Sequence, residues 1–441
     1  MSLNPRKISV QAIYNILKNK STLSHELSIL RGESDLNHTD KRFVSELVTG
    51  VVRNLEYIDY VISLASDVKV TKIAPYVMCV LRIGTYQILF LDKIPQSAAV
   101  DESVKIIKKS SNHRLSGFVN AVLRKVASNG KNFSLPTDTF TANCVKYSCP
   151  QWIADMWRKQ IGDEYEELLS AMNGKPDTIL RVNTLKTNAD YVVESLKSEG
   201  WECQKYASPL FPEADYLISV SKITDLQAST AYKEGLFYVQ DSAGAYVAEI
   251  LNPTPDSVVF DMCASPGGKT THLAEKIKNH GKILAFDVSE SKVKIINENA
   301  KRLGIDVIEA SVSDSSIAHK EFFNKADYIL VDAPCSGLGI IRKKPDIKYL
   351  RQPDDIWQLS DISRKILNAS ANYLKSGGSM VFSTCTTAYE ENETVLFEFL
   401  KNHPDFHLKT IECSKPNEGY MTLYPHIDDC DGFFISLITK E

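Results

Sequence analysis

The sequence predicts a chain of three parts: an all-helical N-terminal domain, a small α+β domain and a C-terminal α/β domain with a parallel sheet. Its 441 residues are enough for two or three separate cores. Apolar residues recur at helical spacing through residues 5–128, and strand-like and helix-like segments alternate from about residue 230 onward. Such alternation is typical of a parallel sheet with helices on its faces. We therefore place the three parts at residues 1–140, 141–228 and 229–441.

The composition is that of an ordinary globular protein, with 43% hydrophobic and 24% charged residues. No apolar run approaches the length of a membrane span, and the first ten residues, MSLNPRKISV, contain no apolar signal core. The nine cysteines form no Cys-x-x-Cys pair and the nine histidines show no zincin spacing, which argues against a disulfide framework and a metal site. We expect a cytoplasmic monomer without membrane or metal partners, in which any cysteine chemistry uses single thiols.

The helical pattern of the first part is interrupted at Gly32, Pro75, Pro95 and the polar residues 110–116, and it ends in a polar linker at residues 128–139. Charge is distributed unevenly along the chain. The first 140 residues contain 19 Lys and Arg against 12 Asp and Glu, whereas the remainder contains 32 against 43. A basic domain on an acidic body favours a polyanionic partner for that domain, although a solvated basic helix face gives the same count.

The second part has a mixed pattern. Two helical segments, QWIADMWRKQIG and YEELLSAMNG, precede a strand in TILRVNTLKT and a helix in ADYVVESLKSEG. Shorter β-like pieces follow around WECQKYA and DYLISV. This order predicts a small α+β domain.

In the third part, five strands are expected in SVVFDMC, KILAFDV, DVIEASV, DYILVDA and SMVFSTC. Each strand ends at, or shortly before, a polar or reactive side chain. In open α/β sheets, ligands bind outside the carboxyl ends of the strands. We therefore expect one cleft to be lined by these side chains: Asp261, Cys263, Asp287, Asp314, Asp332, Cys335 and Cys385.

The segment VVFDMCASPGGKTTHLAEKI reads as a strand, a tight glycine turn and a helix. Gly267 and Gly268 let the backbone approach a ligand closely at a helix N-terminus, where unpaired N–H groups favour negative charge. A phosphate-binding Walker A loop would need a glycine where Cys263 stands, and the Gly-x-Gly-x-x-Gly dinucleotide fingerprint is absent. An S-adenosylmethionine site is the remaining interpretation.

Two side chains near this turn have defined expectations. Asp287 ends the next strand, 19 residues after Gly268, where a carboxylate accepts hydrogen bonds from ribose hydroxyls. The alternative is that Asp287 only caps the following helix. Lys269 carries the wrong charge for a helix N-terminus, so we expect it to meet a carboxylate, either from the cofactor or from a neighbouring aspartate.

Cys335 and Cys385 each follow a predicted strand. A single apolar cysteine is commonly just buried, but two at the strand ends beside a cofactor turn suggest chemistry. Methylation at carbon 5 of a pyrimidine needs a thiolate to add to carbon 6, which makes carbon 5 able to accept a methyl group. A base then removes the proton from carbon 5 and the thiolate leaves. Asp332 is placed to donate a hydrogen bond to N3 of the ring, which would need a raised pKa.

The motifs DMCASPGGKT, DAPCSGLG, RKKPDIKY and STCTTAYEENE resemble those of the Fmu/Sun family of RNA 5-methylcytosine methyltransferases. LRVNTLKT, YVQDSAGAYVAEIL and DGFFISLI are similar to further family motifs, so the resemblance covers about residues 145–441. It implies a Rossmann-like, S-adenosylmethionine-dependent catalytic domain. It further implies that Cys385 attacks the base and that Cys335 assists its release, with Asp332 and Lys269 completing the catalytic set.

The same resemblance implies cofactor contacts, with Glu309 competing with Asp314 for the adenine side. The cofactor residues expected are Cys263, Ala264, Ser265, Pro266, Gly267, Gly268, Lys269, Asp287, Asp314 and Asp332. Ser265 replaces the family's usual alanine and Thr386 replaces a frequent serine, both conservative changes.

The first third resembles NusB, a helical RNA-binding domain, through DKRFVSELVTGVVRN, LRIGTYQILFLDKIPQSAAVDESVKIIKK and GFVNAVLRKV. The combined resemblance implies methylation of one cytosine of 16S rRNA in rRNA processing. We expect RNA contacts from Arg181, Asn183, Arg342, Lys343 and Lys344. Three alternatives are a tRNA cytosine methyltransferase, a non-enzymatic RNA-binding assembly factor and a DNA methyltransferase. The helical domain argues against the first, the intact cysteine motifs against the second, and the lack of a DNA-recognition insert against the third.

Overall fold

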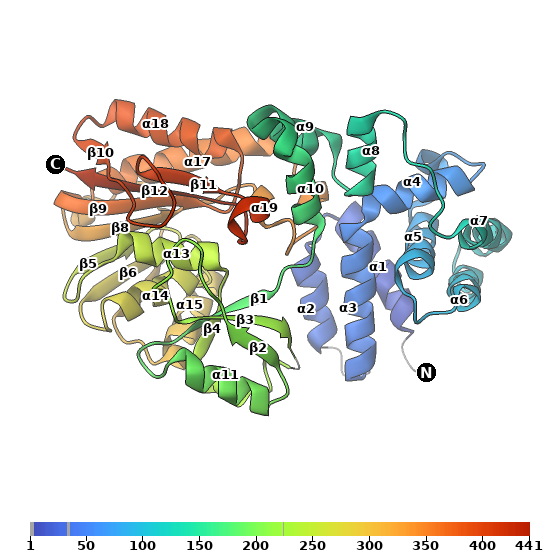
Figure 1. Cartoon of the computed structure of the whole chain (residues 1–441), viewed down its shortest axis with the longest axis horizontal. Coiled ribbons are helices and arrows are strands. Elements are labelled where there is room, and N and C mark those ends of the chain that lie inside the picture. The colour runs from blue at the N-terminus through green and yellow to red at the C-terminus, as the bar shows by residue number, and fades with distance from the viewer. Residues whose placement is uncertain (1–3, 33–35, 224) are drawn as a thin grey trace. The chain divides into compact units, whose positions relative to one another are not determined.

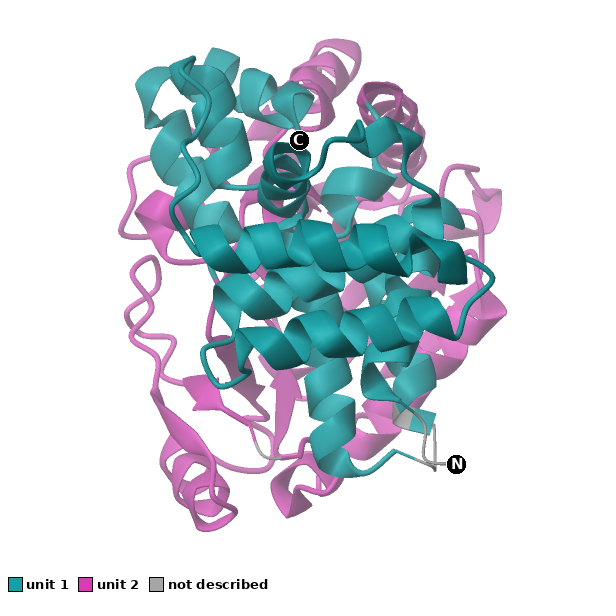
Figure 2. Ribbon diagram, turned by 90° about the vertical axis from the view of Figure 1, so that its right-hand side faces the viewer, with its two compact units in different colours: residues 1–174, 341–352 teal, residues 175–340, 353–441 magenta. Residues whose placement is uncertain are grey.

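A computed structural model describes residues 4–32, 36–223 and 225–441. Figure 2 shows that the chain forms two compact units. Unit 1 contains residues 1–174 and 341–352, and unit 2 contains residues 175–340 and 353–441. The boundaries of the three expected parts stay predictions. The division itself shows that a short segment of the C-terminal part, residues 341–352, is built into the N-terminal unit.

Unit 1 is all-helical, as predicted. Its N-terminal helices are α1 (Pro5–Lys18), α2 (Leu23–Gly32), α3 (His38–Arg53), α4 (Leu55–Ala65), α5 (Pro75–Phe90), α6 (Gln96–Lys108) and α7 (Ser116–Asn129). They are followed by α8 (Thr139–Lys146), α9 (Gln151–Ile161) and α10 (Tyr165–Asn173). Proline suits the start of a helix because its fixed φ matches the first turn. Pro5 and Pro75 are the first residues of α1 and α5, and Pro95 is the N-cap of α6.

The core of unit 1 surrounds α5, which is buried along most of its length. Close packing against α3 depends on Gly50, because a Cβ atom there would lie 2.0 Å from the ring of Tyr86. The Tyr86 hydroxyl donates a hydrogen bond to Glu46 of α3, 2.7 Å away. This hydrogen bond holds the Tyr86 ring in position between α3 and α5.

Residues 341–352, which include the short helix α16 (Ile347–Leu350), are held inside unit 1 by polar contacts. The Asp346 carboxylate accepts the backbone N–H of Leu23 at 2.8 Å, at the start of α2. Lys348 is 3% exposed, and its ammonium donates to the carbonyls of Arg53 at 2.9 Å and Ser148 at 2.5 Å. Burial lowers the pKa of Lys348 to about 8. The segment is therefore an integral part of the helical core.

Unit 2 contains two sheets. The smaller is antiparallel in the order β2-β3-β1-β4, and the helix α11 (Ala189–Ser198) packs against it. Its strands are β1 (Thr178–Val182), β2 (Glu202–Lys205), β3 (Leu217–Lys222) and β4 (Phe237–Val239). The short helix α12 (Thr230–Lys233) leads into β4. This sheet confirms the predicted α+β character of the middle of the chain.

The larger sheet has eight strands in the order β10-β12-β9-β8-β5-β6-β7, with β11 paired to β12. Its strands are β5 (Val258–Asp261), β6 (Lys282–Asp287), β7 (Ile308–Val312), β8 (Ala326–Asp332), β9 (Leu374–Thr384), β10 (Phe406–Leu408), β11 (Tyr420–Leu423) and β12 (Phe433–Lys440). All five predicted strands are present and parallel, whereas β12 runs antiparallel to β9, so the sheet is mixed.

Helices cover both faces of this sheet (Figure 1). They are α13 (Ser242–Leu251), α14 (Gly268–Lys276), α15 (Glu290–Leu303), α17 (Pro353–Ala371), α18 (Glu393–Asn402) and α19 (Pro425–Asp428). Alternate strand residues point to opposite faces, so Val259 packs with α13 and α14 while Phe260 packs with α17 and α18. The chain leaves β5 toward β6 on one side and returns to β8 on the other. This reversal creates a switch point between β5 and β8, where ligands bind in such sheets. Within the described residues, no helix combines the length and apolar character needed to cross a membrane.

Candidate active site

Two of the predicted catalytic residues form an ion pair at the carboxyl end of β8. Lys269, in the first turn of α14, lies with its Nζ 2.6 Å from Oδ2 of Asp332, the last residue of β8. The Ser383 hydroxyl donates to the other carboxylate oxygen at 2.9 Å. Burial alone would lower the pKa of Lys269, but the Asp332 carboxylate outweighs it and raises that pKa. Lys269 therefore meets a neighbouring aspartate, one of the two partners expected from the sequence.

The two predicted cysteines are in contact. Cys335 follows β8, Cys385 follows β9, and their sulfur atoms lie 3.2 Å apart. The strands are parallel neighbours in which Asp332 pairs with Ser383, so the loops leaving them emerge side by side. The contact with Cys385, and then burial, raises the pKa of Cys335 well above its usual value. The two sulfur atoms are within hydrogen-bond distance, and either thiol can be the donor.

A buried polar network supports both cysteine loops. Glu391 is 1% exposed, and its carboxylate accepts the Ser336 N–H at 2.7 Å and the Ser336 hydroxyl. The Ser336 hydroxyl also lies 2.9 Å from that of Thr386, the residue after Cys385. Asn392 adds bonds to the Thr384 hydroxyl and the Thr386 carbonyl. One turn after β9 thus connects the two thiol loops.

Glycine is required at position 339, in the short helix η5 (Leu338–Ile340), where the Cys335 loop passes two backbone segments. Its N–H donates to the Cys385 carbonyl at 3.1 Å, and its own carbonyl accepts the Gly432 N–H at 2.9 Å. A Cβ atom there would lie 1.9 Å from the Gly432 carbonyl oxygen. No other residue permits this approach without displacing the loop.

The glycine turn has the shape expected of a cofactor cradle. Gly267 has φ +97°, which favours glycine, and its N–H donates to the Ala264 carbonyl at 2.7 Å. The Ser265–Pro266 peptide is cis. In the described part of the chain, no side chain caps the N-terminus of α14. These first-turn N–H groups suit an anionic group such as a cofactor carboxylate.

A buried acidic side chain, Asp261, precedes the glycine turn. Asp261 is fully buried and accepts hydrogen bonds from the Thr270 hydroxyl at 2.7 Å and the Cys263 N–H at 3.3 Å. Burial raises the pKa of Asp261 to about 7, although the bond from Thr270 opposes this shift. Cys263 is only partly exposed, and burial followed by the charge of Asp261 raises its pKa well above its usual value. Cys263 is therefore a neutral thiol, unsuited to nucleophilic attack.

The two outer carboxylates lie at neighbouring strand ends. Asp287 ends β6 and accepts the Ser289 N–H at 3.1 Å, whereas the N-cap of α15 is Ser289 and not Asp287. Asp314 follows β7, and bonds from Ser316 lower its pKa. By contrast, the Glu309 carboxylate is paired with Lys282, which begins β6 at its other end. This placement favours Asp314 over Glu309 as the cofactor residue.

Arg181 and Asn183, expected to contact RNA, are buried instead, with 0% and 1% exposure. The Arg181 guanidinium in β1 donates to the Gly268 carbonyl at 2.5 Å, the Thr271 hydroxyl at 2.9 Å and Glu275 at 2.9 Å. It also bonds to Gln240. Asn183 donates to two backbone carbonyls, those of Gly235 and Leu303. Both side chains are buried and make hydrogen bonds within the protein, so neither presents its polar atoms to RNA. The sequence pattern did not reveal this burial.

Replacing Arg181 with methionine is expected to lower the free energy of unfolding by about 3–5 kcal/mol, because it leaves the buried Glu275 carboxylate unpaired. It should also weaken cofactor binding, since Arg181 holds the first turn of α14. Denaturant titration and calorimetry with S-adenosylmethionine measure the two effects. The control is Lys222→Met, which breaks the exposed pair with Glu202 and should cost about 0–1 kcal/mol. Equal losses in the two variants would contradict the assignment.

Arg342, Lys343 and Lys344 belong to the segment that is built into unit 1. Arg342 is 8% exposed, Lys343 is partly exposed and Lys344 is exposed. Of the three, Lys344 presents its charge most openly to solvent. Their RNA contacts stay predictions.

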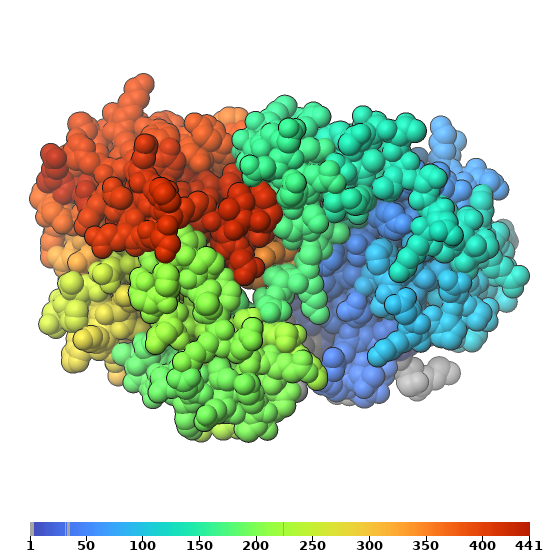
Figure 3. Space-filling view, viewed as in Figure 1, coloured from blue at the N-terminus to red at the C-terminus, as the bar shows by residue number. Residues whose placement is uncertain are grey.

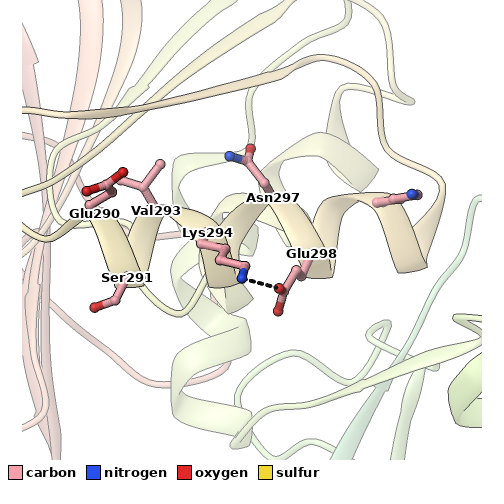
Figure 4. Close-up of a pocket in the computed structure, with 7 residues that line it drawn as sticks. Glu290, Ser291, Val293, Lys294, Asn297 and Glu298 are labelled. Carbon is pink, nitrogen blue, oxygen red and sulfur yellow. Dashed lines mark ion pairs between the residues drawn. The ribbon is translucent and has the colours of Figure 1, made fainter.

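A separate hollow runs along one face of α15 (Figure 4). The side chains drawn there come from that helix alone, and Lys294 and Glu298 form an ion pair at 4.0 Å. It contains none of the predicted site residues. Among the described residues, no group of three or more His, Cys, Asp or Glu side chains is arranged to hold a metal ion.

Some supporting residues were not predicted, namely Ser336, Ser383, Glu391, Asn392, Glu275 and Gln240. A signal was available for Glu391 and Asn392, which lie in the motif STCTTAYEENE shortly after Cys385. Acidic and amide side chains a few residues after a reactive cysteine indicate a local hydrogen-bond acceptor and donor. Glu275 and Gln240 gave no such signal, since their partner Arg181 is distant in sequence.

The mixed sheet, the glycine turn after its first strand and the two thiols beyond β8 and β9 define a Rossmann-like methyltransferase. Three family models match the chain: NusB family over residues 3–128, the ferredoxin-like domain of RsmF/B-like methyltransferases over 149–221, and 16S rRNA methyltransferase RsmB/F over 248–439. The chain belongs to the RsmB/F family of 16S rRNA methyltransferases.

Individual relatives agree with this assignment. A probable ribosomal RNA small subunit methyltransferase B from Bacillus subtilis is 34% identical over 447 residues, covering 99% of this chain and 98% of the relative. The crystal structure of PH0851 has a TM-score of 0.83 at 28% identity and covers 100% of both chains. A methyltransferase homolog protein from Pyrococcus horikoshii has a TM-score of 0.59 at 28% identity, covering 69% of this chain and 100% of its own.

Proposed function

We propose that the protein transfers a methyl group from S-adenosylmethionine to carbon 5 of one cytosine in 16S rRNA, through a covalent bond between Cys385 and carbon 6. The observation that carries the proposal is the pair of thiols 3.2 Å apart beside the Lys269–Asp332 pair. Family membership supports the methyltransferase class and the rRNA substrate. The choice of cytosine carbon 5 rests on the chemistry of the thiols.

The residues around the glycine turn fit the cofactor. The uncapped first turn of α14 suits its carboxylate, Asp287 suits the ribose hydroxyls, and Asp314 suits the adenine side. When bound, the cofactor supplies the methyl group from its sulfonium centre. The buried Arg181 stabilises the glycine turn by donating to the Gly268 carbonyl. The catalytic side chains of the protein then act on the cytosine ring.

On the base, Cys385 forms the bond to carbon 6, and electron density moves into the ring toward carbon 5 and N3. We assign Asp332 to the N3 side of the ring. As negative charge develops on N3, a proton moves from the Lys269 ammonium, 2.6 Å from Asp332, through the carboxyl group to N3, and it returns to Lys269 when the adduct breaks down. After methyl transfer, the carbon 5 proton is lost to solvent. The electrons of the C–H bond restore the carbon 5–carbon 6 double bond, and the carbon–sulfur bond breaks to release Cys385 as a thiolate. The Cys335 thiol stabilises the departing Cys385 thiolate by donating its S–H.

Bisulfite sequencing of RNA from cells with and without the protein tests this function. We expect one cytosine of 16S rRNA to lose its 5-methyl group when the protein is removed, and to regain it when the wild-type protein is restored. Loss of 5-methylcytosine from tRNA instead would support the tRNA alternative. An unchanged pattern in both RNAs would contradict the proposal. We further propose that the protein acts in the cytoplasm as a monomer.

A further inference from the structure

The positive charge of the helical unit is concentrated in one stretch of sequence. Residues 103–137 contain seven Lys and Arg and no Asp or Glu, whereas the rest of residues 1–140 contains twelve of each. The whole basic excess of the first 140 residues therefore comes from the last six residues of α6, from α7 and from the segments that follow each helix, since the acidic Asp101 and Glu102 of α6 lie just before this stretch. The seven residues are Lys105, Lys108, Lys109, Arg114, Arg124, Lys125 and Lys131.

The structure exposes all seven of these side chains. Helices α6 and α7 pack against each other and bury their apolar faces. The buried side chains include Ile106 and Ile107 of α6 and Leu123 of α7. Lys105, Lys108 and Lys109 are spaced i, i+3 and i+4, so they share the outer face of α6. Arg124 and Lys125 lie near the end of α7. Figure 3 shows the α6–α7 region, in light blue to cyan, at the surface of unit 1.

These charges have few partners within the protein. Lys105 pairs with Glu102 at 2.7 Å. Among the residues that the structure describes, no acidic side chain lies within 4.0 Å of the charged atoms of the other six. Glu102 also attracts Lys109 at longer range. The remaining positive charges repel one another and produce a positive field available to an external polyanion. A merely solvated helix face would normally mix both signs of charge.

We propose that the seven residues above form an α6–α7 basic face that binds the sugar–phosphate backbone of rRNA. The inference rests on the proposed function and adds to it the surface that binds the substrate. Charge complementarity favours RNA over an acidic protein. Protein interfaces are built around exposed aromatic or aliphatic anchors. Between residues 96 and 131, the one described large apolar side chain that is strongly exposed is Leu115.

We expect the α6–α7 basic face to contact the RNA backbone and not the bases. Phosphate contacts from lysine and arginine position a nucleic acid and carry no base specificity, so choice of the target cytosine is left to unit 2. The expected signature is a strong salt dependence of RNA binding. Each phosphate contact contributes about 0.7 to the slope of log K against log salt for a single strand.

The test compares two full-length variants that lose the same charge. Lys108, Lys109, Arg124 and Lys125 are changed to glutamine in the first, and Lys18, Lys20, Lys69 and Lys72, also exposed in unit 1, in the second. Affinity for a 16S rRNA transcript is measured over a range of KCl. We expect the first variant to bind about tenfold or more weakly at 0.15 M salt, with a slope smaller by up to about 3. The second should change less than twofold.

Methyl transfer at saturating RNA separates this inference from the proposed function. The first variant should keep its kcat and show a raised KM. Equal affinity and slope in the two variants would overturn the α6–α7 surface, even if wild-type protein methylates cytosine normally. Conversely, a wild-type protein that methylates no cytosine defeats the proposed function, while the difference in salt slope still decides whether the surface binds RNA.

Discussion

Replacing Cys385 with alanine is expected to reduce methylation of 16S rRNA by roughly 10⁴-fold or more, because it removes the atom that makes carbon 5 reactive. Cys385→Ser should be nearly as inactive, since a hydroxyl ionises far less readily than a thiol. Transfer of labelled methyl groups from S-adenosylmethionine to a 16S rRNA transcript measures the loss. Serine keeps almost the same size, so an inactive Cys385→Ser protein with unchanged unfolding excludes a folding defect.

Cys203→Ala is a suitable control for this experiment. Cys203, like Cys385, is partly exposed and forms no disulfide, but it lies in β2 of the small sheet, away from the strand ends that carry the site. We expect the Cys203 variant to retain wild-type activity. Full activity in Cys385→Ala would remove the nucleophile from the proposed mechanism and with it the covalent step.

Replacing Cys335 with alanine is expected to trap the enzyme on its substrate. The sulfur atoms of Cys335 and Cys385 lie 3.2 Å apart, so in the proposed mechanism the Cys335 S–H stabilises Cys385 when it leaves carbon 6 as a thiolate. Without this donor the thiolate attacks at least as readily but departs more slowly, by about 10²–10³-fold if the bond resembles other single catalytic donors. A protein–RNA species that survives denaturing electrophoresis is the readout.

The double variant Cys335→Ala/Cys385→Ala provides the matched control, because it lacks both the leaving-group donor and the nucleophile. It should give no stable protein–RNA band. If Cys335→Ala is inactive yet forms no band, the division of labour between the two thiols is wrong. If Cys385→Ala traps RNA instead, their roles are exchanged.

The chain passes from the Cys335 loop into unit 1 within a few residues. Gly339 bonds to the Cys385 carbonyl, and only two residues later the segment 341–352 of unit 1 begins. There Asp346 and Lys348 make buried contacts with three regions of the helical core. These hydrogen bonds explain how the charged side chains of Asp346 and Lys348 can be buried.

The order of elements and the chemistry at the strand ends follow from the sequence alone. Helical and strand periodicities over residues 5–128 and beyond 230 are local properties, and they indicated the all-helical character of the N-terminal part and the five parallel strands. A parallel sheet brings the carboxyl ends of its strands to one edge. The convergence of Asp332, Cys335 and Cys385 therefore follows from their positions just after predicted strands, and the structure confirms it.

The roles of residues whose partners are distant in sequence depend instead on the three-dimensional contacts. Arg181 reads as an exposed RNA contact, yet burial against α14 makes it a support for the glycine turn, because its partner Glu275 lies 94 residues away. The same holds for Glu391, for the placement of residues 341–352 in unit 1, and for the 3.2 Å contact between the thiols. Periodicity records which face of an element is apolar, whereas burial of a charge depends on which distant side chain compensates it.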